Sequence, residues 1–240
     1  MTFRPLFFSS WVSLLAAVLA INALAAEKAN PGENKLDAGV KENPAMKAIA
    51  DVPGLPRVLV IGDSISIGYT LQVRKLLAGR ANVHRLPNNA QSSGVGLKKL
   101  ETWLAGGKWD VIHFNFGLHD AKLPPEGINH APPDIYEQNL RKIVARLRAT
   151  GAKVIWASTT PIPLGGNLAP NRRFADVTIY NAIAARVMRE NGVAINDLNA
   201  IVTPHFEKVR RPRDVHFTEE GYAILGAAVA QSIGAQLPKR

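Results

Sequence analysis

The chain has 240 residues, a net charge of +10 and no cysteine. This length is enough for one domain with a full hydrophobic core. The lack of cysteine excludes disulfides, thiolate metal sites and a cysteine nucleophile. The positive charge would suit a nucleic-acid-binding protein, but the basic residues are scattered and no nucleic-acid-binding motif accompanies them. We therefore expect a solvated basic surface, open to attraction by an anionic envelope or polysaccharide, and no nucleic-acid partner.

Residues 1–25 have the pattern of a secretory signal peptide. Arg4 precedes a mostly apolar run over 6–24, and Ala23-Leu24-Ala25 is a small-x-small cleavage site. The alternative is an uncleaved membrane anchor, which is disfavoured by the polar residues that interrupt the run: Ser9, Ser10, Ser13 and Asn22. No cysteine lies near the cleavage site, so a lipoprotein anchor is excluded. We expect an exported protein, periplasmic or secreted, with no stable membrane span after cleavage.

Composition divides the remaining chain into two parts. Residues 26–56 are polar, mixed in charge and punctuated by proline and glycine, which predicts a linker or a loosely attached N-terminal arm. A folded domain is predicted over 57–238, where no internal repeat and no second shift in composition occurs.

Strand and helix patterns alternate along this domain. Short apolar runs predict strands over 58–61, 83–86, 111–116, 153–158 and 193–196. Helical patterns predict helices over 69–77, 97–104, 134–149, 176–191 and 218–233, with Asp134 as the N-cap of the third. This alternation predicts an α/β fold of three layers, in which helices cover both faces of a five-stranded parallel sheet.

Polar residues follow the predicted strands at their carboxyl ends, where ligands bind in such sheets. Ser64 follows the first strand, Gly117 to Asp120 follow the third, and Thr159 to Pro163 follow the fourth. Asp214 and His216 lie beyond the fifth, before the last helix. The sequence therefore predicts a site at this edge of the sheet.

Gly62-Asp63-Ser64 places a serine directly after a buried strand, at or just before the start of a helix. Free backbone amides at a helix N-terminus can face a developing oxyanion, which makes Ser64 a candidate nucleophile. The alternative is that Ser64 only caps the helix. The chain has no Gly-x-Ser-x-Gly elbow, which disfavours an ordinary α/β-hydrolase.

Asp214-Val215-His216 supplies the acid and the base that a serine nucleophile needs. In an extended or turn segment, residues two apart can lie on the same side, so the carboxylate can hold Nδ1 while Nε2 faces Ser64. The alternative is a surface acid beside a histidine that caps the last helix.

His119 is a third candidate, because it is an imidazole placed between a strand and a loop. It can donate an N–H to an oxyanion or bind a metal, or it can bond to backbone without a functional role. No ligand spacing in the sequence supports a metal site, so none is expected. His113 lies inside a predicted strand and is expected to be a core residue whose ring nitrogens have hydrogen-bond partners.

In combination and order, these motifs resemble the SGNH or GDSL-type hydrolases. The resemblance covers about residues 57–237 and implies a flavodoxin-like SGNH fold, with Ser64 as nucleophile and Asp214 and His216 as acid and base. The family motif Gly-x-Asn-Asp is here Gly117-Leu118-His119-Asp120, so His119 replaces the oxyanion-hole asparagine. A second motif supplies a glycine amide; counting back from Gly96-Leu97 puts Ala90 in that position, ahead of Gly94. The implied oxyanion hole is therefore formed by Ser64, Ala90 and His119.

The resemblance implies a serine esterase that uses no cofactor and acts on a small-molecule or polysaccharide ester. The polar loops after the third and fourth strands favour short acyl groups, such as acetyl, on a polar alcohol, with a carbohydrate as one candidate. Two alternatives stay open. One is a catalytically weakened protein of this fold that binds an envelope glycan. The other is an O-acyltransferase with the same residues, in which a sugar replaces water as acceptor. The oligomeric state is open too.

Overall fold

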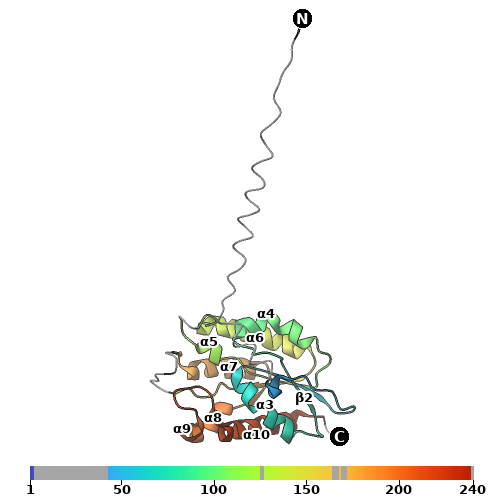
Figure 1. Ribbon diagram of the computed structural model, residues 1–240, viewed down its shortest axis with the longest axis vertical. Coiled ribbons are helices and arrows are strands. Elements are labelled where there is room, and N and C mark those ends of the chain that lie inside the picture. Colours follow the sequence, from blue (N-terminus) through green and yellow to red (C-terminus); the bar gives the residue numbers. More distant parts are fainter. Residues whose placement is uncertain (3–42, 125–126, 164–167, 169–171, 239–240) are drawn as a thin grey trace. The chain divides into compact units, whose positions relative to one another are not determined.

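Figure 1 shows the computed structural model of this protein. Five short strands pair in parallel in the order β2-β1-β3-β4-β5. The structure describes residues 1–2, 43–124, 127–163, 168 and 172–238. The predicted signal peptide and the first part of the predicted linker fall outside the described residues. Residues 41–240 group into one compact unit, to which the following description applies.

The strands are β1 (Arg57–Ile61), β2 (Asn82–Arg85), β3 (Val111–Phe114), β4 (Lys153–Ala157) and β5 (Ala194–Asn196). Val60 lies opposite Arg85 on β2 and His113 on β3, so the carboxyl ends of these three strands lie at one edge. The parallel five-stranded sheet confirms the predicted fold class.

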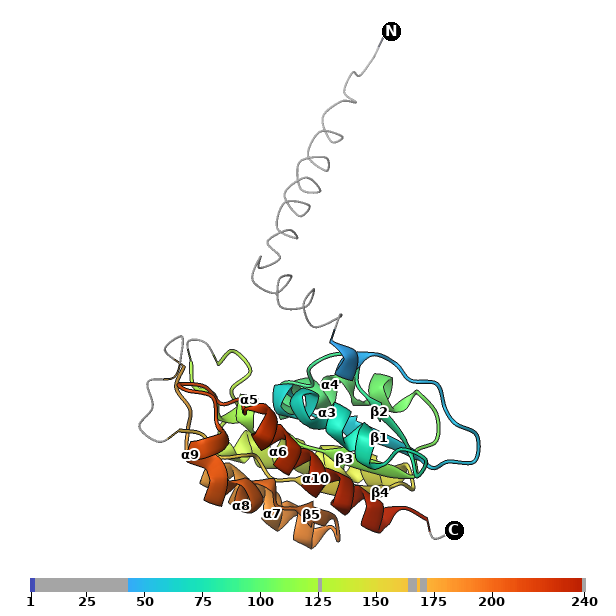
Figure 2. The same cartoon turned by 60° about the horizontal axis from the view of Figure 1, so that its bottom comes forward.

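Helices cover both faces of the sheet (Figure 2). Leu59 and Ile61 pack toward α4 (Ser93–Leu104), α6 (Pro133–Ala149) and α7 (Val177–Glu190), whereas Val58 and Val60 pack toward α3 (Ser64–Leu76) and α10 (Glu219–Gln236). Successive strand residues thus enter two separate apolar cores, which explains why the strands are apolar without alternation.

Two helix starts differ from the prediction. The predicted helix over 69–77 begins at Ser64, because the Asp63 carboxylate caps it by accepting the Ile65 N–H at 2.9 Å. Asp134 is not the N-cap of α6: the helix begins at Pro133, a residue suited to the first helical position, and Asp134 lies inside the first turn. The remaining predicted strands and helices are found within a few residues of their expected ends.

Several short helices were not predicted, because each is too short to show a periodic apolar pattern. They are η1 (Pro44–Met46), α5 (Leu118–Ala121), α8 (Leu198–Val202), η2 (Thr203–His205) and α9 (Phe206–Val209). Among the described residues, no helix is both long enough and apolar enough to cross a membrane.

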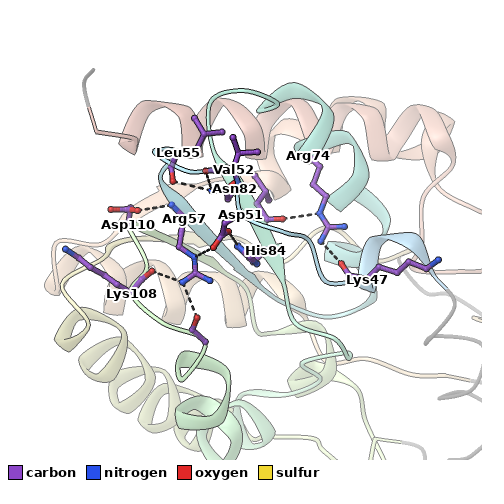
Figure 3. Close-up of polar contacts among 12 residues, drawn as sticks. Lys47, Asp51, Val52, Leu55, Arg57, Arg74, Asn82, His84, Lys108 and Asp110 are labelled. Carbon is purple, nitrogen blue, oxygen red and sulfur yellow. Dashed lines mark hydrogen bonds and ion pairs between the residues drawn. The ribbon is translucent and has the colours of Figure 1, made fainter.

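Residues 43–56, the last part of the predicted linker or arm, pack on the sheet edge at β2 (Figure 3). The Asn82 side chain accepts the Val52 N–H at 2.9 Å and donates to the Val52 carbonyl at 3.0 Å. The Arg74 guanidinium donates to the carbonyls of Pro44 and Lys47 at 3.2 and 3.1 Å. Segment 43–56 therefore forms an attached arm, while the boundary of the domain at residue 57 stays a prediction.

Asp120 is a fully buried residue of α5, and its side chain connects this helix to the start of α4. Its carboxylate accepts the Ser93 N–H at 3.0 Å and the Ser93 hydroxyl at 2.5 Å. Burial raises the pKa of Asp120 to about 6, against the opposing effect of these hydrogen bonds.

Two glycines of α4 give a matched test of packing against the sheet. A methyl group at Gly96 would collide with the buried Phe116 ring, whereas one at Gly94 would meet nothing nearer than the Ser92 Oγ at 3.8 Å. We expect Gly96→Ala to lower the free energy of unfolding by about 1–3 kcal/mol, and Gly94→Ala to leave it unchanged or raise it by a few tenths. Urea unfolding of the two variants measures this, and equal stabilities would contradict the close packing of α4 on Phe116.

The raised pKa of Asp120 predicts a pH dependence of stability. Between the unfolded value near 4 and the folded value near 6, only the folded state keeps this proton, so stability falls as pH rises through that window. Two pH units correspond to about 3 kcal/mol. We expect the difference in free energy of unfolding between the wild type and Asp120→Asn to fall by about 3 kcal/mol from pH 4 to pH 6.5. Parallel pH curves for the two proteins would show that Asp120 does not titrate in this range.

Candidate active site

Ser64, Asp214 and His216 come together in a line of hydrogen bonds at the carboxyl edge of the sheet. The His216 Nε2 lies 2.8 Å from the Ser64 Oγ, and the His216 Nδ1 lies 3.0 Å from both carboxylate oxygens of Asp214. With its proton on Nδ1, the imidazole donates to Asp214 and accepts the serine hydroxyl. The sequence placed these three residues near one edge, and the structure brings them into contact.

Ser64 occupies the first position of α3, directly after the cap Asp63. Its N–H therefore has no partner within the helix, and no described residue accepts it. The N-terminus of a helix carries a partial positive charge. The Ser64 N–H is thus available to an anion that forms beside the Ser64 Oγ.

The loop between α9 and α10 presents Asp214 and His216 on the same side. The Arg211 N–H donates to the His216 carbonyl at 2.8 Å, and the Val215 N–H donates to the Asp214 carboxylate at 2.7 Å. Arg213 takes a positive φ of 55°, which turns the chain just before Asp214. Both functional side chains keep 27% of their surface exposed.

Arg172 is a contact of the acid that the sequence did not reveal. Its guanidinium donates to the Asp214 carboxylate at 2.7 Å. Partial burial raises the pKa of Asp214, but the hydrogen bonds from Arg172 and His216 outweigh it and bring the pKa to about 2. Asp214 therefore stays ionised and can hold an imidazolium. No pattern links positions 172 and 214, which are 42 residues apart.

His119 lies in α5, directly after Gly117 and Leu118. Gly117 takes a φ of +151° and its α-carbon faces Thr159 so closely that a side chain would collide. Burial lowers the pKa of His119, and the charges of Lys122, His216 and Arg172 lower it further against the opposing charge of Asp63. A neutral imidazole keeps one N–H donor, and the role of His119 at an oxyanion stays a prediction.

Ala90 corrects one expectation. Its N–H donates to the Gly62 carbonyl at 3.1 Å and so extends the pairing between the ends of β1 and β2. An amide directed at backbone is not an open donor for an oxyanion. Gly94, the other candidate, lies in the first turn of α4.

His113 is a core residue, as predicted. It is fully buried, and its Nε2 lies 3.2 Å from the Asn196 side-chain nitrogen. Its Nδ1 has no hydrogen-bond partner among the described residues, so the expectation that both ring nitrogens are paired was wrong. Burial lowers the pKa of His113 to about 3, so the ring is neutral. Within the described part of the chain, no group of three or more His, Asp or Glu side chains is placed to hold a metal ion.

A small cavity lies beneath the first turn of α3, lined by polar residues such as Asp63 and Asn115 and by apolar ones such as Ile65 and Leu118. Its volume of about 10 Å³ is enough for one water molecule. This cavity is too small for an ester, and neither Ser64 nor His216 lines it. A substrate would instead approach the partly exposed surface over Ser64 and His216.

Comparison with known proteins agrees with this geometry. Residues 60–224 match the model of the GDSL-like lipase/acylhydrolase family. The chain is 30% identical over 140 residues to esterase TesA of Pseudomonas aeruginosa, a match that covers 54% of this chain and 65%, just under two thirds, of that relative.

Solved structures share the fold. A lipase/acylhydrolase from Enterococcus faecalis superposes with a TM-score of 0.67 at 21% identity, covering 78% of this chain and 99% of the other. Axe2, an acetylxylan esterase from Geobacillus stearothermophilus, superposes with a TM-score of 0.61 at 20% identity, covering 77% and 97%. The family match spans more than half of the chain and contains Ser64, Asp214 and His216. The chain therefore belongs to the GDSL-like lipase/acylhydrolase family.

Proposed function

We propose that this protein is a serine esterase that hydrolyses carboxylic esters with short acyl groups. The observation that carries the proposal is the unbroken line of hydrogen bonds from the Ser64 hydroxyl through His216 to Asp214. Membership of an acylhydrolase family supports the same class of reaction.

In the proposed reaction, His216 Nε2 takes the proton of the Ser64 hydroxyl as its oxygen attacks the ester carbonyl carbon. The ionised Asp214 holds the imidazolium through Nδ1. His216 then gives the proton to the leaving alcohol, which departs and leaves an acyl group on Ser64. A water molecule, activated by the same imidazole, attacks this acyl-enzyme, releases the acid and restores the serine hydroxyl.

The oxyanion of each tetrahedral intermediate needs donors close to Ser64. The Ser64 N–H at the start of α3 is one donor in this proposal, supported by its lack of an acceptor among the described residues. The second is the N–H of the neutral His119, in place of the asparagine that the family motif has. A neutral imidazole suits this role because it keeps one ring N–H that can donate a hydrogen bond.

The substrate we propose is a short acyl ester, acetyl above all, on a carbohydrate. The partly exposed His216 and Asp214 favour an ester presented on a polymer, which needs an open site. Axe2, a protein of the same fold, is an acetylxylan esterase. The hydrogen-bonded triad favours turnover over the alternative of a glycan-binding protein. A sugar acceptor in place of water would make the same residues an O-acyltransferase.

We further propose that the protein is exported. The support is the mostly apolar run over 6–24, at whose end Ala23-Leu24-Ala25 forms a small-x-small cleavage site.

Replacement of the nucleophile tests the reaction. We expect wild-type protein to release acid from p-nitrophenyl acetate and from acetylated xylan, and Ser64→Ala to lose nearly all of both activities. The preference between the two esters reports the substrate class, and added sugar acceptors distinguish transfer from hydrolysis. Ester turnover that survives in Ser64→Ala would overturn the proposal.

The second donor has its own test. Removing one oxyanion donor typically lowers kcat by about 100- to 1,000-fold, and we expect this of His119→Ala. His119→Asn, which restores a side-chain N–H, should recover a large part of that loss. Steady-state kinetics with p-nitrophenyl acetate measure both variants. A His119→Ala protein with wild-type kcat would remove His119 from the oxyanion site.

A further inference from the structure

Arg85 is a buried cation with no carboxylate partner. It ends β2, its residue exposure is 7%, and no described Asp or Glu forms an ion pair with it. Burial lowers the pKa of Arg85 to about 10, so the guanidinium remains charged at neutral pH. The electrostatic effects of nearby Tyr69 and Asp63 favour the charged form of Arg85, but a buried charge outside an ion pair is still costly, so its surroundings must supply strong acceptors.

The acceptors come from the two loops that follow β1 and β2. One terminal nitrogen of Arg85 donates to the Gly62 carbonyl at 2.9 Å, the Asp63 carbonyl at 3.1 Å and the Ser66 hydroxyl oxygen at 2.9 Å. The other donates to the carbonyls of Leu86 and Asn88 at 2.7 and 2.9 Å. One planar group thus ties the loop of Ser64 to the loop that leads to Ala90.

The contact with the Asp63 carbonyl matters most for the site. The Asp63 C=O and the Ser64 N–H are the two ends of one peptide group. A cation that donates to the oxygen draws electron density from the nitrogen, which makes the N–H a stronger donor. The Ser66 hydroxyl also donates to this carbonyl, at 2.7 Å.

We infer that Arg85 is a positioning residue for the oxyanion site, holding the Ser64 amide in place and polarising it through the Asp63 carbonyl. This inference rests on the proposed esterase function. Arg85 does not touch the substrate. The Arg85 charge lies behind the peptide group of Asp63 and Ser64 and is in place before the reaction begins. Its stabilisation of the oxyanion therefore grows as negative charge develops on the ester oxygen.

The attached arm adds a reason for the burial of Arg85. The Met46 side chain, on an arm residue that is 5% exposed, lies 3.5 Å from the Arg85 guanidinium. Arg74 holds this part of the arm by donating to the Lys47 carbonyl (Figure 3) and the Pro44 carbonyl. It also donates to the Val83 carbonyl at 3.0 Å. Arg74 is thus a second arginine that binds three backbone carbonyls, none of them in the loop of Ser64, and it provides a matched control.

The test compares Arg85→Lys and Arg85→Gln with Arg74→Lys in the full chain, by kcat and KM for p-nitrophenyl acetate. The second readout is inhibition by phenylboronic acid, which forms a tetrahedral anion on a reactive serine. We expect both Arg85 variants to lower kcat by about 10- to 100-fold with little change in KM. Phenylboronic acid should bind more weakly by a similar factor. The charge kept in Arg85→Lys should make it the more active of the two, and Arg74→Lys should keep the wild-type kcat.

Ser66→Ala removes a donor to the Asp63 carbonyl and serves if the Arg85 variants do not fold. We expect it to lower kcat several-fold with KM unchanged. The inference would be overturned if a folded Arg85 variant kept the wild-type kcat. If the Arg85 variants do not fold, a wild-type kcat in Ser66→Ala would overturn it instead. A loss of kcat in Arg74→Lys equal to that in the Arg85 variants would also overturn it. Failure of the proposed function looks different, because the wild type itself would then show no Ser64-dependent turnover, and the role of Arg85 would fall with it.

Discussion

The parallel pairing of β1 with β2 and β3 is the constraint on which the site depends. It aligns Val60 with Arg85 and His113, so the chain leaves three neighbouring strands at the same edge. The chain segments that lead to Ser64, Ala90 and His119 begin there. A slip in this register would separate the Ser64 loop from the guanidinium that joins it to its neighbour.

The site is built with its polar groups fixed before any substrate arrives. Asp214 is held by Arg172 as well as by His216, and the Asp63 carbonyl beside Ser64 accepts from both Arg85 and Ser66. Such preorganisation is what electrostatic catalysis requires, since donors that already point the right way need not reorganise as charge develops. The supporting charges are arginines, whose several donors can bind acceptors from two segments at once.

Long elements and the candidate triad could be predicted because their signals are local. Apolar runs and helical spacing located the strands and the main helices, and Gly62-Asp63-Ser64 and Asp214-Val215-His216 are short motifs of chemically meaningful residues. The N-cap of α6 was misassigned because Pro133 competes with Asp134 for the helix start. The short helices α5, α8 and α9 escaped prediction since four or five residues show no periodicity.

Fold class, family resemblance and the residue types available for chemistry follow from pattern and composition, so they can be inferred from the amino-acid sequence. The contacts among the polar groups emerge only when the chain is folded. Arg172 reaches Asp214 across 42 positions, Arg85 ties two loops together, and the Ala90 N–H is directed at the Gly62 carbonyl. Hydrogen bonds between distant segments depend on strand register and loop path, and neither leaves a local signal in the order of amino acids.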